Sequence, residues 1–260
     1  MPRALAPQKP KLSWRLWLRV IAWAALAAGL AFGAREVDSF LMRDPRFGLE
    51  NLEIRGAVYA NRARLQSVFE SDLGRSVFGI PLAERRRHLL AVDWVSGATV
   101  TRVWPNKIVV TVGERKPAAF AKLPMGAVLT GNSARYRMAL IDADGVLLSI
   151  PPRVRFHLPV LSGVTEDQSE ADRNMRVKTM QHLLDDLGPQ AKEISEVNAA
   201  NMEDLRLITT IGGRAVELWI GDQHFRSRYQ LFQSHYAEMR AHSDEANIFD
   251  LRMDDRILAR

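Results

Sequence analysis

The chain has 260 residues, 47% hydrophobic and 25% charged, which is the composition of a globular protein with a sizeable core. It contains no cysteine, so disulfides, thiol catalysis and cysteine-ligated metals are excluded. The formal net charge of +6 is concentrated at the amino terminus, because residues 1–34 hold five basic and no acidic side chains. The rest of the chain is nearly neutral, so we expect no nucleic-acid binding.

The amino-terminal region reads as a membrane anchor. A basic tail, residues 1–13, precedes an apolar segment, residues 14–34, which includes the uncharged run Val20–Ala34 and is long enough to span a bilayer. By the positive-inside rule the tail lies in the cytoplasm and the body outside it. The alternative is a cleaved signal peptide, since Ala31–Ala34 contains small residues. Residues 35–46, mixed and charged, are expected to form a linker.

Residues 47–117 predict a small α+β domain with the order β-α-α-β-β. Leu49–Arg55 alternates like a strand, Asn61 can cap a first helix, and Pro81 suits the first turn of a second. Two further strands flank a corner at Trp104–Asn106. The expected apolar positions are Leu65, Val68, Phe69 and Leu73 in the first helix, Leu82, Leu89 and Leu90 in the second, and Ile108, Val110 and Val112 in the last strand. Arg85, Arg86 and Arg87 are expected to be mostly solvated.

Residues 118–260 predict a mostly antiparallel β domain with flanking helices. Ala139–Asp142 and Gly145–Leu148 read as a hairpin. Ser169 can cap a helix that runs to Leu187 and stops before Gly188-Pro189. Further strands are expected around Leu205–Leu207, Val216–Ile220 and Ile248–Met253, and a second helix over Phe225–His242 carries an aromatic stripe that we expect in the core.

These motifs, in this order, resemble the FtsQ/DivIB family of bacterial cell-division proteins, whose first domain is a polypeptide-transport-associated (POTRA) module. The likeness is carried by Leu52–Gly56, Trp94-Val95, Arg102–Asn106, Glu114–Ala119, Leu158–Gly163 and Asp250–Arg252 behind the apolar segment. The resemblance implies a non-enzymatic, single-pass inner-membrane protein at the division septum, without cofactors. Its partners would include FtsB- and FtsL-like coiled-coil proteins. A transport or assembly module that uses the POTRA domain to clamp peptides is an alternative.

The resemblance places partner binding on Phe249, Asp250, Leu251, Arg252 and Met253. Their alternation fits a strand with one packed face. Because few residues follow, we expect this strand to be the free edge of a sheet, where a partner strand can pair with unused N–H and C=O groups. Arg252 would then bind a partner carboxylate, or it pairs with an acid of its own domain.

The most enzyme-like feature is the strand end Leu140–Gly145, where Asp142 and Asp144 resemble the first motif of haloacid-dehalogenase phosphatases. The remaining phosphatase motifs do not follow, and position 12 of a loop that starts at Asp142 is Arg153, which excludes an EF-hand. None of the six histidines has metal-ligand spacing. We therefore predict a hairpin turn here, with no catalytic residue and no metal site.

Overall fold

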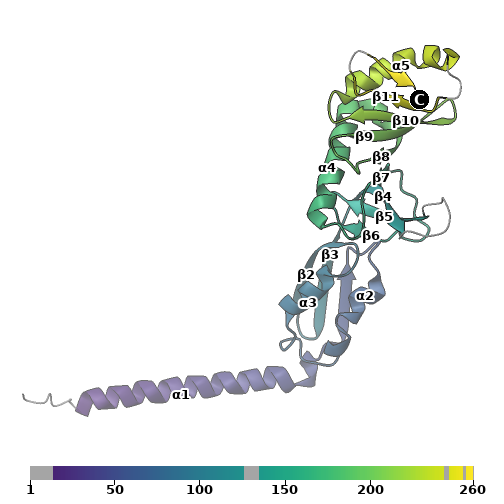
Figure 1. Ribbon diagram of the computed structural model, residues 1–260. Coiled ribbons are helices and arrows are strands. Elements are labelled where there is room, and N and C mark those ends of the chain that lie inside the picture. Colours follow the sequence, from purple (N-terminus) through teal and green to yellow (C-terminus); the bar gives the residue numbers. More distant parts are fainter. Residues whose placement is uncertain (1–13, 126–134, 243–245, 254–255, 260) are drawn as a thin grey trace, which may run out of the picture. The chain divides into compact units, whose positions relative to one another are not determined.

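The computed structural model describes residues 14–125, 135–242, 246–253 and 256–259 (Figure 1). Its contacts divide into two compact units. The first unit contains α1 and continues to Ala57, with Asn61–Val92 and Gly97–Gly113. The second unit contains the remainder from Glu114 onward, together with the short segments Val58–Ala60 and Asp93–Ser96.

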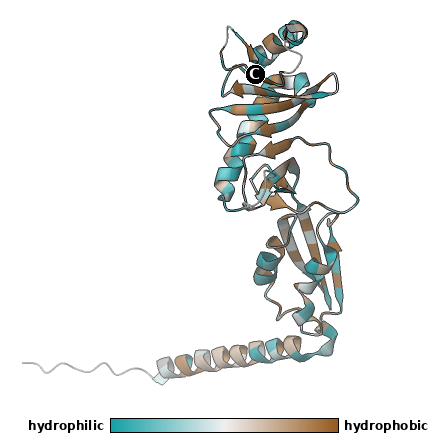
Figure 2. Ribbon diagram, turned by 45° about the vertical axis from the view of Figure 1, so that its right-hand side comes forward, coloured by the Kyte–Doolittle hydropathy of each residue, from teal (hydrophilic) through white to brown (hydrophobic). Residues whose placement is uncertain are grey.

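Helix α1 (Trp14–Arg43) is the one helix of the described residues that is long and apolar enough to cross a membrane. Its apolar residues are visible in Figure 2. The segment Arg35–Arg43, which we expected as part of a linker, continues the helix without a break. The short 3-10 helix η1 (Pro45–Phe47) follows, and the side chain of Asp44 caps it by accepting the Arg46 N–H.

The first unit is built on a three-stranded sheet with the order β1-β3-β2. Strand β1 (Asn51–Arg55) lies parallel to β3 (Lys107–Glu114), and β2 (Val95–Val103) lies on the other side of β3. Helices α2 (Arg62–Ser67) and α3 (Leu82–Leu90) stand between β1 and β2 in the chain. The predicted β-α-α-β-β order is confirmed, and so are the inward positions Ile108, Val110 and Val112.

The two helices of this unit differ in part from the sequence pattern. The side chain of Asn61 caps α2 as predicted, but the helix ends at Ser67 and a 3-10 turn, η2 (Glu70–Asp72), follows. Arg85 is buried rather than solvated, because its guanidinium forms two hydrogen bonds to the buried carboxylate of Asp72, at 2.5 and 3.0 Å. Leu73 and Leu90, expected inside, are exposed.

The second unit is built on a nine-stranded mixed sheet with the order β12-β11-β10-β9-β8-β7-β4-β5-β6. Five of its strand pairs are antiparallel and three are parallel, β4–β7, β7–β8 and β10–β11. The strands are β4 (Pro117–Met125), β5 (Arg135–Asp142), β6 (Leu147–Leu148), β7 (Val160–Ser162), β8 (Ile194–Asn198), β9 (Leu205–Ile211), β10 (Arg214–Gly221), β11 (Ile248–Asp250) and β12 (Leu258–Ala259).

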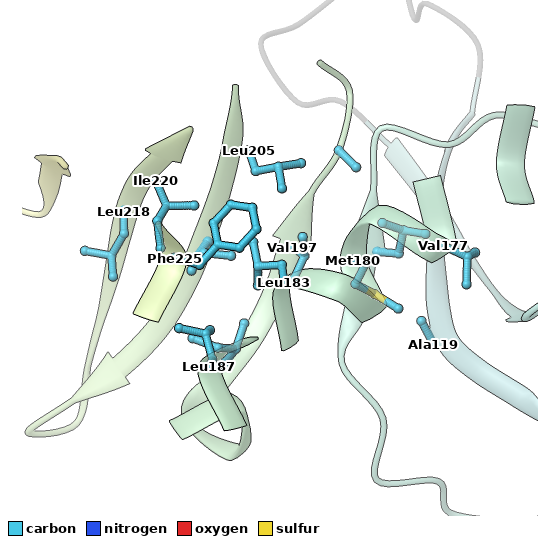
Figure 3. Close-up of a cluster of buried hydrophobic side chains, with 14 of the residues drawn as sticks. Ala119, Val177, Met180, Leu183, Leu187, Val197, Leu205, Leu218, Ile220 and Phe225 are labelled. Atoms are coloured by element: carbon cyan, nitrogen blue, oxygen red, sulfur yellow. The ribbon is translucent and has the colours of Figure 1, made fainter. Parts of the chain in front are cut away.

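Helices α4 (Glu170–Leu187) and α5 (Phe225–His242) pack against the inward side chains of this sheet and form the main core with them. The hydroxyl of Ser169 caps α4 by accepting the Asp172 N–H, as the sequence predicts. Figure 3 shows side chains of α4 and Phe225 of α5 gathered with those of the neighbouring strands. The labelled residues are Ala119, Val177, Met180, Leu183, Leu187, Val197, Leu205, Leu218, Ile220 and Phe225.

Candidate partner-binding edge

The five predicted partner-binding residues lie in two different environments. Phe249 and Leu251 are fully buried in the core of the second unit. The ring of Phe249 contacts Phe232 at 5.2 Å and Tyr236 at 6.0 Å between centroids, both on α5. Arg252 and Met253 are exposed. A partner that binds the folded surface therefore contacts Arg252 and Met253, whereas Phe249 and Leu251 lie beneath the surface.

Strand β11 is not the free edge that the sequence led us to expect. It pairs in parallel with β10 on one side and in antiparallel register with β12 on the other, with Phe249 opposite Ala259 and Asp250 opposite Leu258. The residues after Met253 were too few to suggest another strand, yet two of them suffice to cover this edge. The outermost strand on this side of the described sheet is β12.

The hydrogen bonds of β11 show to which side the backbone N–H and C=O groups of β11 and β12 point. The N–H of Leu251 donates to the carbonyl of Trp219 on β10 at 2.8 Å, so the groups of Leu251 face inward. Because successive residues of a strand point their backbone groups to opposite sides, those of Asp250 face β12 and pair with Leu258. By the same alternation the N–H and C=O of Ala259 face away from β11, and the described sheet offers them no strand partner.

Arg252, which follows β11, is held in place by acids of its own unit. Its Nε and Nη2 donate to the two oxygens of the Asp250 carboxylate at 2.8 and 2.6 Å, and Nη1 lies 3.5 Å from Asp204. The hydrogen bonds to Asp250 raise the pKa of Arg252, so the guanidinium stays charged. The alternative that Arg252 pairs within its own domain is therefore confirmed.

Trp219 stands at the centre of the surface next to Arg252. The guanidinium groups of Arg206 and Arg252 lie 4.3 and 5.0 Å from the centre of its ring, and its indole N–H donates to Glu217. Cation–π contacts of this kind hold guanidinium groups in place without using up all of their N–H donors. This arrangement could not be predicted from the sequence, because the three side chains come from three separate strands or strand ends.

A shallow groove of about 230 Å³ lies between α5 and the segment that leads into β12. It is lined by apolar and charged side chains together, which are Leu231, His235, Glu238, Met239, Arg256 and Ile257. A groove beside a free strand edge can receive a side chain of a strand that pairs with that edge.

The Asp142–Gly145 turn has a structural role. One oxygen of the buried Asp142 carboxylate accepts the N–H groups of Asp144 and Val146, and the other accepts a bond from Arg115 at 2.7 Å. Gly145 has a φ of +84°, as the turn requires. The predicted hairpin turn is confirmed. Across the residues that the structure describes, no group of three or more His, Asp or Glu side chains is placed to hold a metal ion.

The fold and this edge define a class: an α+β protein with a potential membrane helix, a POTRA-like domain and a β domain that carries an open strand edge. Residues 47–115 match the family described as "POTRA domain, FtsQ-type". The chain is also similar to proteins named cell division protein FtsQ. The one from Koribacter versatilis is 33% identical over 222 residues, covering 82% of this chain and 61% of the relative.

Two further relatives with the same name come from other bacteria. The protein of Novosphingobium aromaticivorans is 28% identical and is covered over 70% of its length, and that of a Geobacter species is 24% identical and is covered over 84%. The chain thus spans about three fifths of the first relative and more of the others. The chain contains a domain of the FtsQ-type POTRA family, and over most of its length it is similar to proteins named cell division protein FtsQ.

Proposed function

We propose that the protein is a single-pass scaffold of the bacterial division machinery, anchored in the inner membrane at the septum. Residues 1–13 lie in the cytoplasm and the two units outside it, where they recruit and regulate other division proteins without forming or breaking a covalent bond. The name of its relatives supports a division role. The five basic and no acidic residues before Arg35 support the orientation.

The observation that carries the proposal is the open edge of β12, the outermost strand on this side of the described sheet, which pairs with Asp250 two residues before the exposed Arg252. A strand of a small coiled-coil partner of the FtsB or FtsL type would pair with β12 through the outward backbone groups of Ala259. Main-chain hydrogen bonds supply affinity in this mode, and neighbouring side chains supply specificity. The predicted binding segment Phe249–Met253 then acts in two parts. Phe249 and Leu251 hold the strand pair in place, whereas Arg252 and Met253 face the partner.

The test is capture of an FtsB-like partner by the full-length chain in detergent or membranes. Ala259→Pro removes an outward N–H and leaves the bond between Leu258 and β11 in place, so it should weaken capture on the order of tenfold. Ala259→Val, which keeps the N–H, is the matched control and should bind nearly as the parent does. Equal binding by the Pro and Val variants would contradict the proposed edge.

Proline at position 251 cannot serve this purpose, because the Leu251 N–H already bonds to Trp219 within the sheet. Truncation after Asn247 fails for a related reason, since it removes Phe249 and Leu251 from the core. A loss of binding in either variant would report unfolding.

Septal location is tested separately with a fluorescent fusion in dividing cells. We expect enrichment at midcell. A uniform membrane signal would contradict the scaffold role.

The orientation is tested by mass spectrometry of the mature protein, where a new amino terminus near Ala34 or Arg35 would show a cleaved signal peptide in place of an anchor.

A further inference from the structure

A row of four aromatic side chains runs through the first unit from the end of α1 to the β2–β3 turn. We call it the aromatic row: Phe40, Phe47, Phe78 and Trp104. Neighbouring ring centroids lie 6.0, 5.3 and 5.1 Å apart, and each pair meets edge to face. Edge-to-face pairs at these distances are favourable, so the row is a defined arrangement of rings.

Both ends of the aromatic row are open to solvent. Trp104 is 68% exposed and Phe40 is 55% exposed. Met42, Leu73 and Val103 of the same unit are exposed as well. A large indole left outside the core, with apolar neighbours on the same unit, marks an interaction site more often than a defect of packing.

The aromatic row is fixed to the rest of its unit by side-chain bonds to backbone carbonyls. Arg102 donates to the carbonyls of Val77 and Ile80 at 2.6 and 2.7 Å, which holds the loop of Phe78 against the hairpin. The hydroxyl of Ser76 donates to the carbonyl of Leu41 at 2.6 Å, which joins the same loop to the end of α1. The rings therefore hold a set position relative to the helix that precedes them.

The β2–β3 turn lies at the end of the unit where α1 arrives. Strand β1 begins just after η1, and β3 runs parallel to β1, so both strands start at the same end. The N–H groups of Glu50 and Asn51 donate to the carbonyl of Asn106 at 3.1 and 3.3 Å, which places the turn beside the entry of β1. Trp104 therefore sits at the end of the unit closest along the chain to the membrane helix.

The length of α1 sets the distance from this end to the lipid. A helix rises about 1.5 Å per residue, so the 21 residues from Trp14 to Ala34 span about 30 Å, the thickness of the hydrocarbon core. Phe40 lies six residues further, about 9 Å beyond Ala34. The headgroup layer is about 5–8 Å thick on each side, and helix tilt reduces the height of Phe40 above it.

We infer that the aromatic row is a second, peripheral contact with the bilayer, in which Trp104 and Phe40 sit among the lipid headgroups and hold the first unit against the membrane surface. The inference depends on the membrane anchoring in the proposed function. Tryptophan prefers this interface because its ring is apolar and its N–H remains hydrated. Residues 35–46 contain three basic and three acidic side chains and so carry no net charge. The contact of the aromatic row with the bilayer is therefore not expected to depend on anionic lipid.

The test uses the full chain reconstituted in phosphatidylcholine vesicles. The chain has no cysteine, so Val103→Cys allows a single spin label beside Trp104 while the indole is kept. Thr111→Cys, exposed near the opposite end of β3, is the matched control. We expect the label at position 103 to shift toward access by oxygen and away from access by a water-soluble nickel complex, relative to position 111.

Replacing Trp104 should move the label back into water. In the Val103→Cys background, Trp104→Ser should lose the shift and Trp104→Tyr should keep most of it. Adding anionic phosphatidylglycerol should change neither result.

Equal accessibility at positions 103 and 111 would overturn the inference, and so would protection at 103 that requires another protein. If the chain does not remain with the vesicles at all, the anchoring in the proposed function fails. A chain that remains with its label in water contradicts only the aromatic contact.

Discussion

The two units each contain a bidentate arginine–aspartate pair, and the two pairs differ in exposure. In the first unit the side chain of Arg85 is 11% exposed and that of Asp72 is fully buried. In the second unit the side chain of Arg252 is 40% exposed, whereas that of Asp250 is 6% exposed, so the two pairs differ in the exposure of the arginine and not of the aspartate. The hydrogen-bond geometry is similar in both, so exposure is what separates them.

The difference teaches which charged pairs can take part in binding. When one partner of a buried pair is removed, the other charge remains without solvent or counter-charge, which is strongly destabilising. The exposed guanidinium of Arg252 loses little when it exchanges Asp250 for water or for a partner's carboxylate, and the buried Asp250 carboxylate keeps the hydrogen bond from the backbone N–H of Arg252. Arg85 is therefore confined to stabilising its unit, whereas Arg252 is available to a second protein.

The largest effect is expected at the buried pair. Arg85→Ala should lower the stability of the first unit by about 3 kcal/mol, because the buried Asp72 loses both bonds from Arg85 and keeps only the one from Arg75 at 3.2 Å. Hydrogen exchange of the amides in β1 and β3 measures this locally. Arg87→Ala, in the same helix but exposed, is the control and should change little. A small effect at Arg85 would remove the distinction between the two pairs.

An intermediate effect is expected at the pair between Arg115 and Asp142, where the arginine side chain is 21% exposed. Asp142→Asn should cost about 1–3 kcal/mol, because the amide cannot satisfy all the donors that face the carboxylate. Asp144→Asn, an exposed neighbour, should be nearly neutral, and both variants should keep division function where they fold. Thermal unfolding and complementation measure the two properties. Loss of function in a folded Asp144→Asn variant would argue for chemistry at this turn.

A small effect on stability is expected at the edge. Arg252→Ala should cost about 1 kcal/mol, less than Arg85→Ala, because the buried Asp250 carboxylate keeps the hydrogen bond from the backbone N–H of residue 252. Arg252→Glu should nevertheless weaken capture of an FtsB-like partner and leave membrane association unchanged. Hydrogen exchange in β10 and β11 together with a capture assay separates the two quantities. Strong destabilisation by Arg252→Ala would show that this pair resembles the buried one.

At neutral pH the smallest effect is expected at Tyr229, whose contribution separates the units only at alkaline pH. Burial raises the pKa of Tyr229 to about 12, whereas an unfolded tyrosine ionises near pH 10. The stability that neutral Tyr229 contributes is therefore full below pH 10 and is lost as the pH rises through about 12. In Tyr229→Phe this part of the alkaline dependence should vanish from the second unit and leave the first unchanged. Hydrogen exchange at several pH values, corrected for intrinsic rates, measures it.

Long periodic segments were predictable because each carries its own signals. Helix α4 has a serine cap and a stop at Gly188, and α5 has an aromatic stripe that the core uses. Strands β4, β7 and β8 were missed. The buried positions of β4 include Ala119 and Ala121, whose small side chains give little periodic contrast. Strand β12 has two residues, fewer than any period can be read from.

The burial of Arg85 could have been read from the sequence, since it lies three residues after Leu82 and four before Leu89, on the same helical face. Its partner could not, because Asp72 belongs to a separate turn. The candidate edge was misplaced by one strand for a similar reason. The order of strands in a sheet depends on how the chain returns, and the alternation of Phe249–Met253 carries no information on which neighbour covers it.

Because α1 continues without a break to Arg43, the first unit has a fixed rotational orientation about the axis of the membrane helix. Each residue of an α-helix turns the chain by about 100° and advances it by about 1.5 Å. One residue added within Arg35–Arg43 would swing the unit through more than a quarter of a circle at almost the same height. Seven added residues would restore the rotational orientation of the unit to within about 20° but would move it about 10 Å further from the membrane. The number of residues in this short stretch therefore sets the rotation and the height of the unit together, and neither of these insertions preserves both.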